Sequence, residues 1–206
     1  MWYTFLRFWA QLIFSVLFGI RAYGQRNVPR TGGVILASSH QSYLDPVIVG
    51  VGLERQIHIM ARENLFRNGL FRRLIESLNA FPVERNSADL AAMHEAIRRL
   101  RAGSVLLLFP EGTRTRSGEI GRLQPGLGIL AFRSAAAVVP VSIQGAFRCW
   151  PRGRRVFRPG QIRVMFGRPL RVSSTKREDL ASFVEELRSR LVEQQQGLQR
   201  IDRLRG

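Results

Sequence analysis

Residues 34–46 read VILASSHQSYLDP, and they combine the signals of a strand, a polar turn and the start of a helix. Its first five residues are apolar or small, a run that is typical of a short buried strand. A polar turn follows the run, and Pro46 can open a helix directly after the turn. A strand that passes through a polar turn into a helix is a building unit of α/β proteins.

Short apolar runs and helical patterns continue to alternate along the chain. We expect strands at 56–61, 80–83, 105–109, 138–143 and 161–166, and helices at 65–78, 88–101 and 126–134. This alternation predicts an α/β domain with a mostly parallel sheet flanked by helices. Residues 176–204 carry apolar side chains at alternating spacings of four and three, which predicts a closing amphipathic helix.

The N-terminal segment differs from the rest of the chain. Residues 2–20 are mostly Phe, Leu, Ile, Val and Trp, and their one charge is at Arg7. A helix of this length is about 28 Å long, just enough to cross the hydrocarbon core of a bilayer. We predict an N-terminal apolar membrane-associating helix over residues 1–24, which spans the membrane or lies in its interface. A core helix and a cleaved signal peptide are the alternatives. Residues 25–206 are expected to form one domain.

Composition narrows the possible functions. The chain has 206 residues and a net charge of +17, from 32 Lys and Arg against 15 Asp and Glu. Its single cysteine excludes an intramolecular disulfide framework, and its three histidines lack the spacing of zinc ligands. We therefore expect no metal and no redox cofactor. The charge favours a nucleic acid, an anionic membrane or a phosphorylated substrate as partner.

The polar turn after the first strand contains a candidate acid–base pair. Strand ends of this kind are where open α/β sheets bind ligands. His40 and Asp45 are five residues apart, so a turn can bring the carboxylate to the imidazole. An aspartate on one ring nitrogen fixes the tautomer and leaves the other nitrogen to take a proton. The alternative is that Asp45 only caps the next helix.

A second polar stretch, FPEGTRTRSG at residues 109–118, also follows a predicted strand. Gly112 permits a close approach of the backbone, and Thr113 offers a hydroxyl group. Arg114 offers a planar fork that suits a phosphate. By itself, this stretch is equally compatible with an exposed polar loop.

Together, His-x-x-x-x-Asp after one strand and Phe-Pro-Glu-Gly-Thr-Arg after a later strand resemble the glycerolipid acyltransferase family, the family of 1-acyl-glycerol-3-phosphate acyltransferases. FPVER at residues 81–85 resembles its second motif, VPVSI at 139–143 its fourth, and RENLF at 62–66 a Lys-Glu-Leu segment upstream of the second. The second motif usually ends in an arginine for the acceptor phosphate, here Arg85. Asn79 stands where that family usually has a glycine.

The resemblance implies an enzyme that transfers a fatty acyl group to the free hydroxyl of a lysophospholipid. The donor would be acyl-CoA or acyl carrier protein, and the acceptor 1-acyl-glycerol-3-phosphate, which gives phosphatidic acid; a lyso-ornithine lipid is the alternative acceptor. His40 would be the general base and Asp45 would orient it. The acceptor phosphate would be bound by Arg85 and Arg114, with the site shaped by Glu111, Gly112 and Thr113. An acyl-enzyme on one of the nearby serines is the rival mechanism.

A second block of charge lies at residues 146–171, with eight arginines and no acidic residue. Interleaved aromatic residues make it compatible with single-stranded nucleic acid, an anionic lipid surface or an acidic carrier protein. Nucleic-acid binding leaves the His–Asp pair and the apolar N-terminus unexplained, and the chain has no helix-turn-helix, zinc-finger or RNA-recognition signature. We expect no nucleic acid, and association with the cytoplasmic face of the cell membrane.

Overall fold

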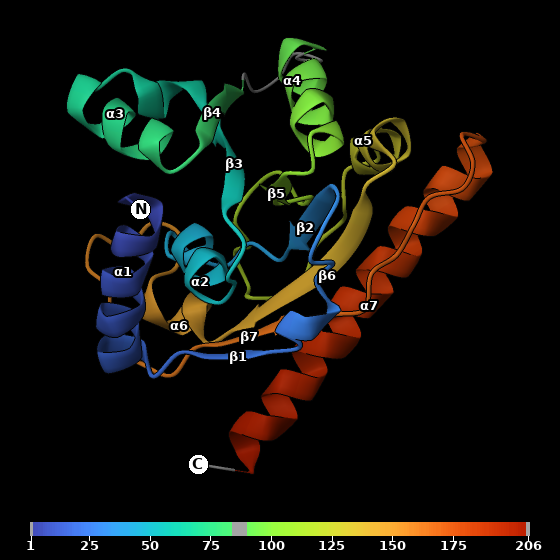
Figure 1. The fold of residues 1–206 in the computed structure, drawn as a ribbon. Helices are drawn as coiled ribbons and strands as arrows, with labels where there is room; N and C mark the ends of the chain where they lie inside the picture. The colour runs from blue at the N-terminus through green and yellow to red at the C-terminus, as the bar shows by residue number, and fades with distance from the viewer. Residues whose placement is uncertain (1, 84–89, 205–206) are drawn as a thin grey trace.

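The computed structural model describes residues 2–83 and 90–204 and contains a seven-stranded sheet (Figure 1). The strands are β1 (Arg21–Tyr23), β2 (Val34–Ser38), β3 (Ile57–Arg62), β4 (Ala80–Val83), β5 (Val105–Leu108), β6 (Ala137–Gln144) and β7 (Arg163–Phe166). Their order in the sheet is β1-β7-β6-β2-β5-β3-β4. All neighbours are parallel except β6 and β7. The prediction of a mostly parallel sheet is therefore confirmed.

Helices cover both faces of the sheet, as Figure 1 shows. They are α1 (Trp2–Phe18), α2 (Asp45–Val51), α3 (Gly69–Ser77), α4 (Leu90–Arg101), α5 (Gly126–Ser134), α6 (Ala146–Cys149) and α7 (Arg177–Arg203), with short 3-10 helices η1 (Gln25–Asn27) and η2 (Glu63–Phe66). One apolar core joins the sheet to α1, α2 and α6. A second core joins the opposite face to α4, α5 and α7.

The central strands β2 and β6 explain why the sequence adopts this sheet. Every residue of both strands is buried. Strands that are covered on both faces need continuous apolar runs, because each side chain faces a helix layer. Val34 of β2 pairs with Val105 of β5 on one side and with Ala137 of β6 on the other. The expected strand at 34–38 is thus the middle strand of the seven-stranded sheet.

One expected helix is divided into two pieces. The sequence predicted a helix over 65–78, but the chain forms η2 and then begins again as α3 at Gly69. Asn68 has extended backbone angles, and its side-chain oxygen accepts the amide of Phe71 at 3.0 Å. Asparagine in this position is a strong N-cap, so it starts a new helix instead of continuing the old one.

The N-terminal helix α1 has two different sides. Phe14, Leu17 and Phe18 pack against the core of the sheet. The outer side leaves large apolar side chains exposed, namely Trp2, Phe5, Phe8, Trp9, Leu12, Ile13 and Val16. Within the described residues, no helix combines the length and the apolar character needed to span a bilayer.

Candidate active site

The two polar stretches meet at one edge of the sheet. Strands β2 and β5 are parallel neighbours, so their carboxyl ends bring the turn after Ser38 next to the loop after Leu108. The backbone amide of His40 donates to Oε1 of Glu111 at 3.0 Å, and the amide of Thr115 donates to the His40 carbonyl at 2.8 Å. The residues predicted from two motifs about 70 positions apart are therefore in direct contact.

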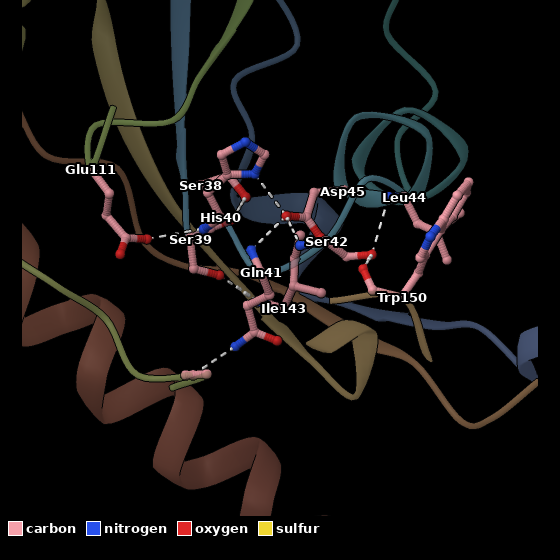
Figure 2. Close-up of polar contacts among 11 residues, drawn as sticks. Ser38, Ser39, His40, Gln41, Ser42, Leu44, Asp45, Glu111, Ile143 and Trp150 are labelled. Atoms are coloured by element: carbon pink, nitrogen blue, oxygen red, sulfur yellow. Dashed lines mark hydrogen bonds and ion pairs between the residues drawn. The ribbon is translucent and has the colours of Figure 1, made fainter. Parts of the chain in front are cut away.

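His40 and Asp45 form the pair that their spacing predicted (Figure 2). The His40 Nδ1 and Asp45 Oδ2 atoms are 2.9 Å apart. The same carboxylate oxygen accepts the amides of Gln41 at 2.6 Å and Ser42 at 2.8 Å. Leu44, the N-cap of α2, makes no side-chain capping bond. The two amides that Asp45 accepts belong to residues before α2. Asp45 therefore holds the turn together and orients the imidazole, so it does more than cap the helix.

The environment of Asp45 is unusual for a carboxylate. Its side chain is fully buried, and burial raises the pKa of Asp45 because it penalises the charged form. Hydrogen bonds from His40, Ser42 and Gln41 act in the opposite direction and lower that pKa. Burial is the largest of these effects, so the pKa of Asp45 is raised overall; the three donors on one oxygen, and a positive charge on His40, act against that rise.

The ring of His40 is fixed from a second side. Phe109 stacks on it, with ring centroids 3.9 Å apart and an interplanar angle of 20°. When Asp45 is ionised it can only accept hydrogen bonds; in that state Nδ1 carries the proton and Nε2 keeps its lone pair. The His40 side chain is 18% exposed. The arrangement therefore offers a proton acceptor of fixed orientation with access to solvent.

The serines of the turn have structural partners. Ser38 Oγ donates to the Ser39 carbonyl, and Ser39 Oγ accepts the amide of Ile143. Ser42 Oγ donates to the Trp150 carbonyl at 2.7 Å and accepts the amide of Leu44. All three are buried, and none is hydrogen-bonded to the His40 ring in the described part of the chain. The geometry gives no support to a Ser–His acyl-enzyme.

Glu111 links the turn to the loop. Its Oε1 accepts the His40 amide, and its Oε2 accepts the amide of Gly121 at 2.9 Å. Burial raises the pKa of Glu111, while these two hydrogen bonds lower it. Because both oxygens accept backbone amides, the side chain holds the loop against the His40 turn.

The remaining loop residues are more open. Gly112 has a left-handed backbone (φ 69°), which favours glycine, and Thr113 is exposed. The Arg114 guanidinium lies over the Tyr43 ring, 3.6 Å from its centroid. Tyr43 belongs to the His40 turn, so this cation–π contact places a fork of donors next to the predicted base. The sequence indicated Arg114 but carried no signal for Tyr43, because a cation–π partner has no fixed spacing.

The second motif is described only in part. Arg85 lies outside the described residues. Asn79, just before β4, has a positive φ of 62°. Asparagine tolerates this left-handed conformation better than most residues, which explains how it can replace the expected glycine. Arg99 of α4 donates to the Asn79 carbonyl and lies over the Phe81 ring, 4.5 Å from its centroid. The sequence did not indicate Arg99.

The basic segment 146–171 borders the site but is not uniform. Arg163 is buried and forms an ion pair with Asp202 of α7. The other arginines are exposed, namely Arg148, Arg152, Arg154, Arg155, Arg158, Arg168 and Arg171. Nη1 of Arg152 lies 3.5 Å from Oγ1 of Thr113. Part of this charge is therefore next to the loop that carries Arg114.

The described residues at this edge of the sheet do not gather metal ligands. Over residues 2–83 and 90–204, no group of three His, Cys, Asp or Glu side chains is placed to hold an ion. The chemistry that the described residues offer is proton transfer at His40 and anion binding by arginine.

Comparisons with known proteins relate this chain to acyltransferases. A family model described as Acyltransferase matches residues 19–144. The chain is 30% identical over 196 residues to a protein of Bacillus subtilis named 1-acyl-sn-glycerol-3-phosphate acyltransferase, covering 93% of this chain and 96% of that one. A Pseudomonas aeruginosa protein of the same name is 28% identical over 169 residues, covering 81% of this chain and 64% of that one.

A solved structure extends the comparison to three dimensions. The 1-acyl-sn-glycerophosphate acyltransferase PlsC of Thermotoga maritima has a TM-score of 0.77 and 26% identity to this chain. The match covers 93% of this chain and 79% of that one. On the family match, the relatives and the fold together, this chain belongs to the Acyltransferase family.

Proposed function

We propose that this acyltransferase moves a fatty acyl group from a thioester to the free hydroxyl of 1-acyl-glycerol-3-phosphate, which gives phosphatidic acid. The observation that carries the proposal is the His40–Asp45 pair, joined at 2.9 Å and tied to the Glu111–Arg114 loop at the carboxyl edge of the sheet. The names of the Bacillus and Thermotoga relatives support the choice of acceptor.

The reaction that suits this site is direct attack by the acceptor hydroxyl. Nε2 of His40 takes the hydroxyl proton while the oxygen forms a bond to the thioester carbonyl carbon. The tetrahedral intermediate then expels the thiolate, which takes the proton back from the imidazolium as the C–S bond breaks. Asp45 stabilises the imidazolium between these steps. The serines of the turn take no part, because their hydroxyls are bonded to the backbone.

The acceptor phosphate is assigned to the loop. Arg114 can form two parallel hydrogen bonds to a phosphate, and Thr113 adds a hydroxyl. Arg85 is assigned to the same phosphate from its motif alone. A phosphate held at a fixed distance from His40 would present the hydroxyl of the acceptor to Nε2, which saves the entropy of orienting it.

The acyl donor is assigned as acyl-CoA or acyl carrier protein. Both present a thioester and a negatively charged carrier. The exposed arginines of the 146–171 segment border the Thr113 side of the site through Arg152. A polyanionic carrier is the partner that this charge favours.

We also assign the protein to an anionic membrane surface, at the cytoplasmic face of the cell membrane. The support is the exposed apolar side of α1, which is larger than a chance scatter of apolar residues. Trp2 of α1 donates to Ser77 Oγ at the end of α3, whose Leu70, Phe71 and Leu74 are also exposed. Figure 1 shows α1 and α3 on the same side of the sheet. Arg72 and Arg73 of α3 are exposed next to these apolar side chains and suit lipid phosphates.

One experiment tests the reaction. The purified protein is given lysophosphatidic acid, a lyso-ornithine lipid or another lysophospholipid in vesicles, with acyl-CoA or acyl carrier protein as donor. Mass spectrometry then identifies the products. We expect phosphatidic acid as the fastest-forming product. If only the lyso-ornithine lipid gave a product, it would be the acceptor in place of lysophosphatidic acid. If no acceptor gave a product, the proposal would be refuted.

A flotation assay tests the membrane assignment. Val16→Glu places a charge on the exposed side of α1, whereas Leu90→Glu does the same on α4, on the opposite face of the sheet. We expect the first variant, but not the second, to lose binding to vesicles with anionic lipid. Equal binding by both variants would contradict the assignment. Binding to a labelled oligonucleotide without binding to vesicles would favour the nucleic-acid alternative.

A further inference from the structure

The carbonyl of Gly118 is the meeting point of three segments of the chain. Gln41 of the catalytic turn donates to it through Nε2 at 3.1 Å, and Gln195 of α7 donates through Nε2 at 2.8 Å. Gly118 itself belongs to the loop that carries Thr113 and Arg114. Figure 2 shows the Gln41 side chain extending away from Asp45, toward that loop. A polar side chain on the buried side of α7 thus reaches the candidate site.

Helix α7 is locked in register on the sheet close to Gln195. Ser142 of β6 is fully buried, and its Oγ lies 2.9 Å from the Leu191 carbonyl and 3.0 Å from Oε1 of Gln194. Leu191 and Leu198 are also fully buried, one on each side of Gln195 in the sequence. The position of the Gln195 amide is therefore set by the core of the domain and not by the loop.

A second side chain of α7 contacts the same loop. Nε of Arg188 donates to the Gly121 carbonyl at 3.2 Å. Arg188 and Gln195 are seven residues apart, so they lie on the same side of the helix. The amide of Gly121 in turn donates to Glu111, which is bonded to His40. The loop is thus held by α7 on one side and by the His40 turn on the other.

We infer that Gln195 is a positioning residue for the acceptor: α7 sets where Thr113 and Arg114 stand relative to His40. This inference rests on the proposed function, because it assumes that the loop binds the acceptor phosphate. Helix α7 lies beyond residues 19–144, which the family model matches. At Gly118 the loop is held by the amides of Gln41 and Gln195, so loss of the Gln195 hydrogen bond lets this part of the loop shift. Small misplacements of a bound substrate are costly in rate.

The test compares two neighbouring glutamines. Gln195→Met keeps the length of the side chain but cannot donate, and Gln196→Met makes the same change at an exposed position of the same helix. We expect Gln195→Met to raise the acceptor KM about five- to tenfold, as the loss of one hydrogen bond does. The donor KM should change less than twofold. Gln196→Met should match the wild type in every constant.

Two further variants exclude a general loss of stability. Arg188→Met removes an exposed contact to the loop, and Arg190→Met removes an exposed ion pair to Glu186 elsewhere on α7. We expect the first to raise the acceptor KM about two- to threefold and the second to change nothing. Gln41→Met combined with Gln195→Met should be non-additive in acceptor kcat/KM, because both amides bond the same carbonyl.

The outcomes separate the inference from the proposed function. No transfer by the wild-type protein to any lysolipid would refute both. Wild-type transfer with an unchanged acceptor KM in Gln195→Met would refute the positioning role alone. An equal rise in donor and acceptor KM, or a fall in kcat and thermal midpoint with both KM values unchanged, would make Gln195 merely structural and would also refute it.

Discussion

The turn at residues 38–45 and the loop at residues 111–121 lie side by side at the carboxyl edge of the sheet, but they are held in different ways. In the turn, Ser38, Ser39, Ser42 and Asp45 are buried and bonded to neighbouring backbone groups. In the loop, residues 112, 113, 116, 117 and 119 are exposed, and the segment is attached through the contacts of Glu111, Thr115, Gly118 and Gly121 and through the buried Ile120.

This difference separates two tasks of an enzyme site. A proton acceptor must keep one orientation through the reaction, and a buried turn with matched hydrogen bonds provides that. A site for a charged headgroup must be open, because its ligand arrives from solvent or from a membrane. We therefore expect changes in the turn to lower kcat and changes in the loop to raise the acceptor KM.

The largest effect is expected for His40→Ala. The variant removes the proposed base, and general-base catalysis contributes up to about 10⁴-fold to a rate. We predict a loss of that order in kcat, with the circular dichroism spectrum and the thermal midpoint close to those of the wild type. A folded His40→Ala protein that keeps a tenth of the activity would remove His40 from the chemistry.

Asp45→Asn should have the next largest effect. The amide oxygen can still accept backbone amides, but the side chain can no longer stabilise an imidazolium. We predict a fall of about 10²- to 10³-fold in kcat and a change of less than threefold in the acceptor KM. Steady-state kinetics at saturating donor separates the two constants. A rise in KM without a fall in kcat would assign Asp45 to acceptor binding, like the loop, and not to the chemistry.

Arg114→Lys tests the loop. Lysine keeps the charge but loses the planar fork and the stacking on Tyr43. We predict that the acceptor KM rises about tenfold while kcat changes little. Arg116→Lys, at an exposed position of the same loop, is the matched control and should leave both constants unchanged. If Arg114→Lys lowers kcat as strongly as Asp45→Asn does, the two segments do not divide the tasks.

Ser39→Ala should affect stability and not activity. The Ser39 hydroxyl accepts the buried amide of Ile143 at 3.0 Å, and its removal leaves that amide without an acceptor. We predict a loss of about 1–3 kcal/mol in the free energy of unfolding, measured by urea denaturation. The kcat should stay within about twofold of the wild type. A loss of activity as large as that of His40→Ala would revive the acyl-enzyme mechanism.

The sequence predicted the middle of the fold better than its margins. Strands β2 and β4 and helix α5 appear at their expected bounds, because buried runs and helical periodicity are strong signals. Strand β1 and helix α6 were not expected, since elements of three and four residues are too short to show a period. The expected helix at 65–78 was wrong in its middle, where Asn68 starts a new helix.

In the candidate site, the sequence likewise revealed what local patterns mark and missed contacts between distant segments. The motifs indicated His40, Asp45 and Glu111, because each is fixed by its position after a strand. The contacts of Tyr43, Gln41 and Gln195 could not be predicted, since they join segments that meet only in the folded chain. A run of arginines in the sequence likewise does not reveal that Arg163 is buried against Asp202.

Glu111 belongs to the loop in sequence, but its side chain accepts a hydrogen bond from the His40 amide of the turn. Its contribution to stability therefore measures how firmly the two segments are joined. Burial raises its pKa in the folded protein, so as pH rises from about 4.5 the unfolded chain loses this proton before the folded protein does. The stability that this carboxyl contributes is therefore present at low pH and declines as pH rises through the raised pKa. Glu111→Gln cannot titrate, so the wild-type minus variant free energy of unfolding should fall between pH 4.5 and 7.5. Urea denaturation across that range measures the difference. A difference that grows with pH would show that the two hydrogen bonds from backbone amides lower the pKa of Glu111 more than burial raises it.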